Sequence, residues 1–325
     1  MGCKVEGICF LHEIKPMEDE TMKMIVDTRG LSKTYGSRHV VQDLDLKVPE
    51  GCVYGLMGPN GAGKSTTMKM LLGLIKRSNG RVFIDGKEMN EKNRLAVLRE
   101  TGSLIEQPSY YGHLTGRENL EIVQTLKGVS SKRIDEVLRL VRLETQQNKK
   151  VREYSQGMKQ RLGLAEALIG GLKLLILDEP TNALDPAGIQ EIRELICDLP
   201  RRMGITVLIS SHLLNEIDQM ADYVGIINHG QLIFQDKLEV LREHSQNSIL
   251  LKAINGTATQ QILKAQNITY SMQEDGILIP AISNGKLSEL IVRLVYGGAG
   301  IYRVEECQKS LEEIFLSLTG RRGSL

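Results

Sequence analysis

The stretch of sequence that decides the fold is CVYGLMGPNGAGKSTTMKMLLGLI, residues 52–75. A short apolar run leads into a glycine-rich turn, and the turn continues into a segment with helical spacing. Within the turn, Gly58, Gly63, Lys64 and Ser65 fill every fixed position of the pattern G-x-x-x-x-G-K-[ST]. A pattern of this kind between a strand and a helix predicts a loop that binds the phosphates of a nucleoside triphosphate.

The residue types of this loop suit phosphate chemistry. Glycines let the backbone curl with its N–H groups pointing inward, where a Cβ would block the phosphate oxygens. The helix that begins near Lys64 aims the positive end of its dipole at the same place. Lys64 can reach the β- and γ-phosphates, and Ser65 offers a hydroxyl to Mg²⁺. The predicted nucleotide-binding loop consists of Gly58, Pro59, Asn60, Gly61, Ala62, Gly63, Lys64, Ser65 and Thr66.

Composition limits the class of protein. The chain has 325 residues, an apolar fraction of 41% and a formal net charge of +1, with few aromatic residues and no Trp. These values suit one large domain with a small one, or two domains, and they favour no nucleic-acid partner. Five scattered cysteines without C-x-x-C spacing indicate a reduced, cytosolic protein. The most apolar run, residues 168–177, is too short for a membrane span and contains Lys173.

The chain divides by pattern into three parts. Residues 1–23 are predicted to be a disordered extension, residues 24–238 a nucleotide-binding α/β domain, and residues 239–325 a small α+β appendage. Within the α/β domain, residues from about 108 to 170 carry helical spacing only, which predicts a helical insertion. Before the phosphate loop, Leu44, Leu46 and Val48 alternate with polar residues, as in one half-buried antiparallel strand.

A second phosphate-chemistry motif is LLILDEP, residues 174–180. A buried apolar strand that ends in two acids suits phosphoryl transfer: Asp178 would hold Mg²⁺ and Glu179 would polarise the attacking water. On its own, the motif is more simply explained as a strand that ends at the protein surface, where acidic residues are common. Its position downstream of a complete phosphate loop favours the catalytic interpretation.

Two further segments gain their meaning from the first two. YSQGMKQR, residues 154–161, places Ser155 where a helix N-cap would lie, with Gly157 two residues on. ISSHLLNEID places His212 directly after another buried strand. Capping explains an isolated Ser155, and a lone histidine after a strand is more often structural than catalytic.

Taken together, these motifs resemble the ATP-binding subunits of the ATP-binding-cassette (ABC) family. The resemblance covers roughly residues 25–237, and every landmark appears in the family's order. It implies a P-loop NTPase core of ABC type, with a mostly parallel sheet, an antiparallel β subdomain and the helical insertion. It also implies ATP and Mg²⁺ as cofactors, and a head-to-tail pair of subunits that encloses two ATP molecules.

The resemblance implies roles for individual residues. Tyr35 would stack on adenine, and His212 would contact the γ-phosphate. Ser155 and Gly157 would form the signature segment, which contacts the γ-phosphate held by the second subunit. TNALD, residues 181–185, looks like the D-loop of the family. Its Asp185 is the last of the residues expected to contact ATP.

The sequence departs from the family pattern at two places. The usual signature LSGGQ reads YSQGM here, with Tyr154, Gln156 and Met158 as the changed residues. The family has a glutamine in a segment called the Q-loop, and this position corresponds to Glu106 here, or to Gln107 in the alternative register. Either side chain would ligate Mg²⁺. Glu106 is also a candidate catalytic residue. These departures resemble the ATPases that confer bacitracin resistance or lantibiotic immunity.

The expected function is therefore an ATPase subunit that powers a separate membrane permease and exports a peptide antibiotic. Such a subunit would be cytoplasmic and peripheral on the inner face of the cell membrane, with the permease docking near residues 106–120. We expect a homodimer, although the sequence leaves a heterodimer open, as it does the substrate and the role of the appendage. One alternative is a soluble ABC-type ATPase acting on ribosomes or DNA; such proteins usually have two cassettes or basic patches, which this sequence does not show. The other is a P-loop kinase or GTPase, and the signature segment present here argues against that class.

Overall fold

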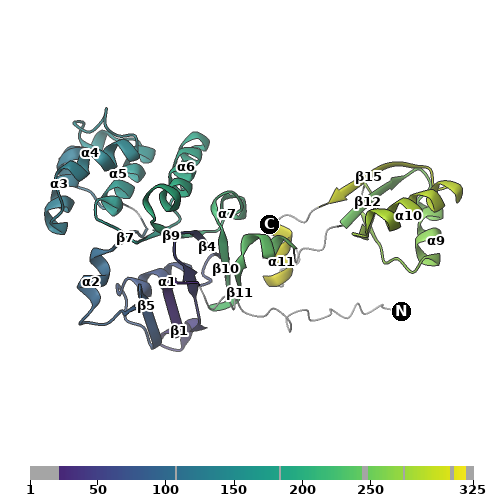
Figure 1. Ribbon diagram of the computed structural model, residues 1–325, viewed down its shortest axis with the longest axis horizontal. Coiled ribbons are helices and arrows are strands. Elements are labelled where there is room, and N and C mark those ends of the chain that lie inside the picture. Colours follow the sequence, from purple (N-terminus) through teal and green to yellow (C-terminus); the bar gives the residue numbers. More distant parts are fainter. Residues whose placement is uncertain are drawn as a thin grey trace. The chain divides into compact units, whose positions relative to one another are not determined.

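The computed structural model separates into two compact units, residues 1–238 and residues 239–325 (Figure 1). Each unit is described by itself. The predicted extension at residues 1–23 lies almost entirely outside the described residues, as does Gln107. The structure describes residues 22–106, 108–182, 184–243, 248–273, 275–307 and 311–319.

A mostly parallel sheet forms the centre of the first unit. Among the described residues, its strand order is β11-β10-β4-β9-β8-β7, and β11 alone pairs antiparallel with its neighbour. Strands β4, β8 and β9 are buried along their whole length, as expected for parallel strands that are covered on both faces. The strands are β4 (Val53–Met57), β7 (Thr101–Leu104), β8 (Leu174–Asp178), β9 (Thr206–Ser211), β10 (Tyr223–Asn228) and β11 (Gln231–Lys237).

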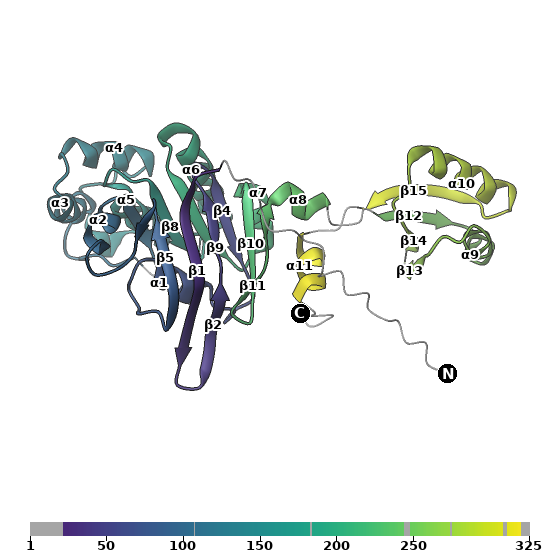
Figure 2. The ribbon, with the colours of Figure 1, turned by 60° about the horizontal axis from the view of Figure 1, so that its bottom comes forward.

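An antiparallel sheet accompanies the parallel one (Figure 2). Helix α1 (Lys64–Leu71) contacts β2 of this sheet and β8 of the parallel sheet, so it packs between the two. Its Met68 and Leu71 join a core that draws residues from both sheets. The fold class expected from the sequence is confirmed. The antiparallel strands are β1 (Met24–Tyr35), β2 (Arg38–Leu44), β3 (Lys47–Pro49), β5 (Asn79–Ile84) and β6 (Lys87–Glu88).

Helices occupy the chain between β7 and β8. The first of them, α3, begins with a capping box in which Thr115 and Glu118 bond each other's backbone N–H. Tyr154 is buried just before α5, and its hydroxyl donates to the carbonyl oxygen of Gln146 at 2.8 Å. Further along, α6 and α7 pack against strands of the parallel sheet. The helices are α2 (Arg94–Arg99), α3 (Gly116–Lys127), α4 (Lys132–Leu140), α5 (Gln156–Leu168), α6 (Pro186–Met203) and α7 (Leu214–Met220).

The second unit has the βαββαβ order of ferredoxin-like folds. Its antiparallel sheet runs β13-β14-β12-β15, and Leu251, Leu263, Ile279 and Leu294 belong to its own core. Helices α9 and α10 contact each other, and α10 contacts β15. The elements are β12 (Ser248–Ala253), α9 (Gly256–Ala265), β13 (Ser271–Gln273), β14 (Gly276–Pro280), α10 (Asn284–Tyr296) and β15 (Ile301–Cys307), flanked by α8 (Leu238–Glu243) and α11 (Leu311–Thr319).

The strand predicted across residues 43–48 is interrupted. Strand β2 ends at Leu44, Asp43 has a φ of 46°, and β3 resumes at Lys47. The cause is Thr28, whose hydroxyl donates to the carbonyl oxygen of Leu44 and accepts the N–H of Leu46, both at 2.7 Å. The hydroxyl replaces the strand partners that these two groups would otherwise need.

Within the described residues, no helix combines the length and the apolar character needed to cross a bilayer.

Thr28→Val should destabilise the first unit by about 1–3 kcal/mol, because it leaves a buried carbonyl and a buried N–H without their shared partner. Thr125→Val is the matched control, since the exposed Thr125 hydroxyl only donates to a carbonyl within its own helix. It should change stability by less than about 0.5 kcal/mol. Urea unfolding followed by circular dichroism measures both, and equal effects would contradict the role of Thr28.

Candidate functional site

Three neighbouring parallel strands bring the predicted site residues to one edge of the sheet. Strand β9 lies between β4 and β8, and its Ser211 pairs with Met57 of β4 while its Ser210 pairs with Asp178 of β8. The phosphate loop follows β4, Glu179 follows β8 and His212 follows β9. Carboxyl ends of parallel strands are where α/β sheets bind their ligands.

Two glycines of the phosphate loop have no room for a side chain. A Cβ on Gly58 would lie 2.4 Å from the carbonyl oxygen of Ile227. Gly63 has a φ of 112°, and a Cβ there would lie 2.9 Å from the carbonyl oxygen of Val40. Both positions therefore require glycine for steric reasons within the fold, in addition to any contact with phosphate.

Lys64 begins α1 and is only 5% exposed. Its Nζ donates to the carbonyl oxygen of Gly58 at 2.7 Å. Burial lowers the pKa of the ammonium, and the nearby charges of Glu179 and Asp178 oppose that change. The structure thus brings the cation of the phosphate loop and the two acids that follow β8 within electrostatic reach of one another.

The rest of the loop varies in exposure. Ser65 and Thr66 lie half-buried in the first turn of α1, and Ala62 is buried. Pro59 is half-buried, whereas Asn60 and Gly61 at the tip are exposed.

Asp178 and Glu179 share a partner, Ser210. The Ser210 hydroxyl donates to Asp178 Oδ1 at 2.5 Å and accepts the backbone N–H of Glu179 at 3.0 Å. Asp178 is 6% exposed. His212 Nδ1 lies 3.2 Å from Glu179 Oε2, so the structure brings together the two side chains expected to act on the γ-phosphate and the attacking water.

Glu106 and Glu179 both have left-handed backbones, with φ values of 64° and 49°. For residues with a Cβ this region is disfavoured, and such residues concentrate at functional sites. Glu106 pairs with Lys69 of α1, and this contact lowers the pKa of the Glu106 carboxyl. Because Gln107 lies outside the described residues, the alternative Q-loop register stays a prediction.

Tyr35 ends β1 and is 50% exposed. The ammonium of Lys33 lies 4.5 Å from the centre of its ring, in a cation–π contact. An aromatic ring placed this way at the end of a strand can stack on a base with the remaining face.

The other predicted contacts begin helices. Ser155 is the N-cap of α5 and accepts the N–H of Met158 at 3.2 Å, and Gly157 lies half-buried in the first turn. Asp185 is the N-cap of α6 and accepts the N–H of Gly188 at 2.9 Å. Ser155 and Asp185 therefore have structural roles that are independent of any ATP contact.

Two residues that the sequence did not single out help to build the site. Ser210 holds both acids, as described above. The buried Gln160 of α5 donates from Nε2 to the carbonyl oxygen of Pro180 at 2.9 Å, which ties the YSQGMKQR helix to the turn after Glu179. In the sequence, both residues could have been recognised as polar residues within otherwise apolar segments.

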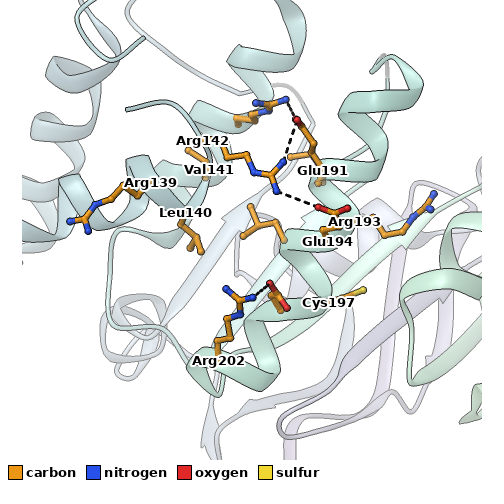
Figure 3. A pocket seen from close by; sticks show the side chains of 13 residues that line it. Arg139, Leu140, Val141, Arg142, Glu191, Arg193, Glu194, Cys197 and Arg202 are labelled. Carbon is orange, nitrogen blue, oxygen red and sulfur yellow. Dashed lines mark hydrogen bonds and ion pairs between the residues drawn. The ribbon is translucent and has the colours of Figure 1, made fainter. Parts of the chain in front are cut away.

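A cavity of about 600 Å³ lies between α4, α5 and α6 (Figure 3). In it, Arg142 pairs with Glu191 at 3.4 Å and with Glu194 at 3.3 Å, and Arg161 of α5 also pairs with Glu191. These ion pairs link the helices before β8 to α6. The lining contains none of the phosphate-loop or strand-end residues described above.

Comparison with known proteins identifies the family. The ABC transporter family model matches residues 41–182. The chain is 41% identical over 303 residues to the bacitracin transport ATP-binding protein BcrA of Bacillus licheniformis, which covers 92% of this chain and 98% of that protein. The chain belongs to the ABC transporter ATP-binding proteins. It is an ATPase subunit of this family, as the sequence predicted.

Other relatives support the same assignment for this ABC ATPase. The lantibiotic transport ATP-binding protein SrtF of Streptococcus pyogenes is 44% identical over 227 residues, which is 69% of this chain and 97% of that protein. Among solved structures, the dimeric ATP-binding cassette MJ0796 in a post-hydrolysis state with ADP and phosphate matches with a TM-score of 0.60 and 28% identity, over 66% of this chain and 98% of that one.

Lys69→Gln should raise the pKa of Glu106 toward its ordinary value, because the ion pair with Lys69 is what lowers it. The measurement is an NMR titration of glutamate side-chain carboxyl carbons, with Glu106 assigned by substitution. Lys92→Gln, at an exposed position without a described carboxylate contact, is the control. An unchanged Glu106 pKa in Lys69→Gln would refute the pairing.

Proposed function

We propose that this ABC ATPase hydrolyses MgATP at the edge where β4, β9 and β8 end, and that hydrolysis drives export of a peptide antibiotic through a separate membrane permease. The observation that carries the catalytic part is the 3.2 Å contact between His212 and Glu179, beside a complete phosphate loop. The observation that supports the transport part is the near full-length similarity to BcrA.

ATP would bind to this edge through its phosphates and its base. Backbone N–H groups of residues 58–66 and the dipole of α1 would face the phosphates, and Lys64 would transfer its hydrogen bonds from loop carbonyls to the β- and γ-phosphates. Tyr35 would stack on adenine. The burial of Lys64 strengthens the attraction of its cation to phosphate, because water screens the charge less.

The residues around Asp178 fit a magnesium ion. Mg²⁺ prefers hard oxygen ligands and is usually held by one or two protein groups together with substrate phosphates. Asp178 is a buried carboxylate with a single described donor, Ser210, and Ser65 lies in the first turn of α1. We assign these two oxygens to the ion, with Glu106 or Gln107 reaching it from the end of β7. When bound, Mg²⁺ would neutralise charge on the β- and γ-phosphates.

Hydrolysis would depend on Glu179 and His212. Glu179 would orient and polarise the attacking water with the carboxylate that now contacts His212. His212 would exchange its contact with Glu179 for the γ-phosphate. Ser210 would hold Asp178 and Glu179 in fixed positions relative to each other, since its one hydroxyl contacts both residues.

A second subunit would complete each site. Ser155 and Gly157 are accessible at the start of α5, so they can contact the γ-phosphate held by a partner cassette. The dimeric form of the MJ0796 cassette supports this arrangement. We propose a homodimer that closes on two ATP molecules, pushes the permease into its other state and resets after hydrolysis.

The proposed location and substrate follow from the named relatives. BcrA is a bacitracin transport protein and SrtF a lantibiotic transport protein, so a peptide antibiotic is the proposed cargo. The ATPase would lie on the cytoplasmic face of the cell membrane, bound through a permease that contacts residues 106–120. No nucleic acid enters this proposal.

Glu179→Gln should keep ATP binding, trap an ATP-bound dimer and lower kcat roughly 10²–10⁴-fold, because an amide cannot polarise the attacking water. Phosphate release measures turnover, and size-exclusion chromatography with ATP measures the dimer. Glu91→Gln, at an exposed position, should hydrolyse ATP at the unaltered rate. Normal turnover in Glu179→Gln would remove Glu179 from its assigned role.

The transport proposal predicts a stoichiometric partner with several membrane spans. Tagged protein purified from detergent-solubilised cells, with partners identified by mass, tests this directly. The isolated complex should show ATP hydrolysis that bacitracin or a lantibiotic changes. Enrichment of ribosomes or DNA without a membrane partner would reject the transport proposal in favour of a soluble ABC-type ATPase.

A further inference from the structure

A buried glutamate, Glu216, contacts the two segments that carry the proposed catalytic pair. It is in α7, four residues after His212 in the sequence, and is 5% exposed. Its Oε2 accepts the hydroxyl of Thr181 at 2.6 Å and the hydroxyl of Ser211 at 3.1 Å. Both partners are buried as well, at 5% and 3% exposure. One carboxylate oxygen therefore joins three chain segments away from solvent.

The two hydroxyls belong to the segments that carry Glu179 and His212. Thr181 follows Glu179 by two residues, and Ser211 directly precedes His212. The Ser211 hydroxyl also accepts the N–H of Leu213 at 3.0 Å, so it fixes the turn on both sides of His212. Among the described contacts, the hydrogen bond to Glu216 is the one that connects the Thr181 side chain to the turn containing His212.

The second oxygen of Glu216 favours a functional reason for this residue. Oε1 is buried and has no hydrogen-bond partner among the described residues. A buried acceptor without a partner is unfavourable, and an apolar side chain of similar size would fill the same space without that penalty. The same apolar side chain would leave the buried hydroxyls of Thr181 and Ser211 without their shared acceptor, so the role that Glu216 fills is that of a strong acceptor between these two hydroxyls.

We propose that Glu216 is a positioning residue that clamps the segment after β8 to the turn after β9, and so holds His212 within reach of Glu179. The inference rests on the catalytic roles proposed above for His212 and Glu179. The Thr181–Glu216–Ser211 clamp acts on kcat rather than on ATP affinity, because none of its three residues is among the predicted ATP contacts. Release of the clamp removes the side-chain tie between Thr181 and the His212 turn, while Ser210 still contacts Asp178 and Glu179.

Glu216→Met and Thr181→Val test the clamp, because each removes one side of the Thr181 contact at similar side-chain size. Each should lower kcat about 10- to 100-fold with little change in KM for ATP, as expected when a catalytic group is displaced. The conservative partners Glu216→Gln and Thr181→Ser keep an acceptor and a hydroxyl, and should stay near the wild-type rate. The double variant should lose no more than the worse single variant, because both changes break one interaction.

A second measurement does not depend on hydrolysis. Carbethoxylation of His212 by diethylpyrocarbonate, followed by peptide mass spectrometry, should be severalfold faster in Glu216→Met and Thr181→Val, with the exposed His39 as internal reference. Wild-type modification rates in both variants would overturn the clamp, and if Glu216→Met fails to fold, the Thr181 pair decides alone. If hydrolysis is instead insensitive to Glu179→Gln, the proposed function fails while the modification rates still report on the clamp.

Discussion

The hydroxyl of Ser210 is the contact on which the geometry of the site depends. It lies on strand β9 and contacts both Asp178, the last residue of the neighbouring strand β8, and the backbone of Glu179, which follows that strand. A parallel ladder already sets the two strands side by side, but ladder hydrogen bonds alone do not orient the carboxylates at a strand end. A short, buried hydroxyl bond to a carboxylate supplies that orientation, since charged acceptors form the stronger hydrogen bonds.

The same edge shows how far sequence reasoning reaches. The phosphate loop, Asp178, Glu179 and His212 were predictable because each stands in a local motif directly after an apolar run. The partners of these residues were not, because Ser210 contacts Asp178 from a strand 32 positions away, and Lys69 reaches Glu106 across 37 positions. A local sequence pattern indicates which catalytic groups are present. The side chains that orient those groups depend on the order of the strands in the sheet.

One prediction about secondary structure failed for a related reason. The alternation of Leu44, Leu46 and Val48 correctly marked three buried side chains, but it did not reveal the break in the strand. Thr28 takes over the hydrogen bonds at the break from a position that precedes it by 16 to 18 residues. Burial follows from alternation, while hydrogen-bond partners follow from the fold.

The final antiparallel strand of the first unit has a wider consequence. Strand β11 pairs with β10 and ends at Lys237, so the hydrogen bonding of the parallel sheet is complete before the second unit begins. Among the described strands, those of residues 248–307 pair only with one another. The match to BcrA is long enough to extend well into the second unit, whereas SrtF matches over 227 residues, about the length of the first unit alone. The strand pairing of the ATPase unit therefore needs no contribution from the ferredoxin-like unit, and a relative of about the first unit's length exists in the same family.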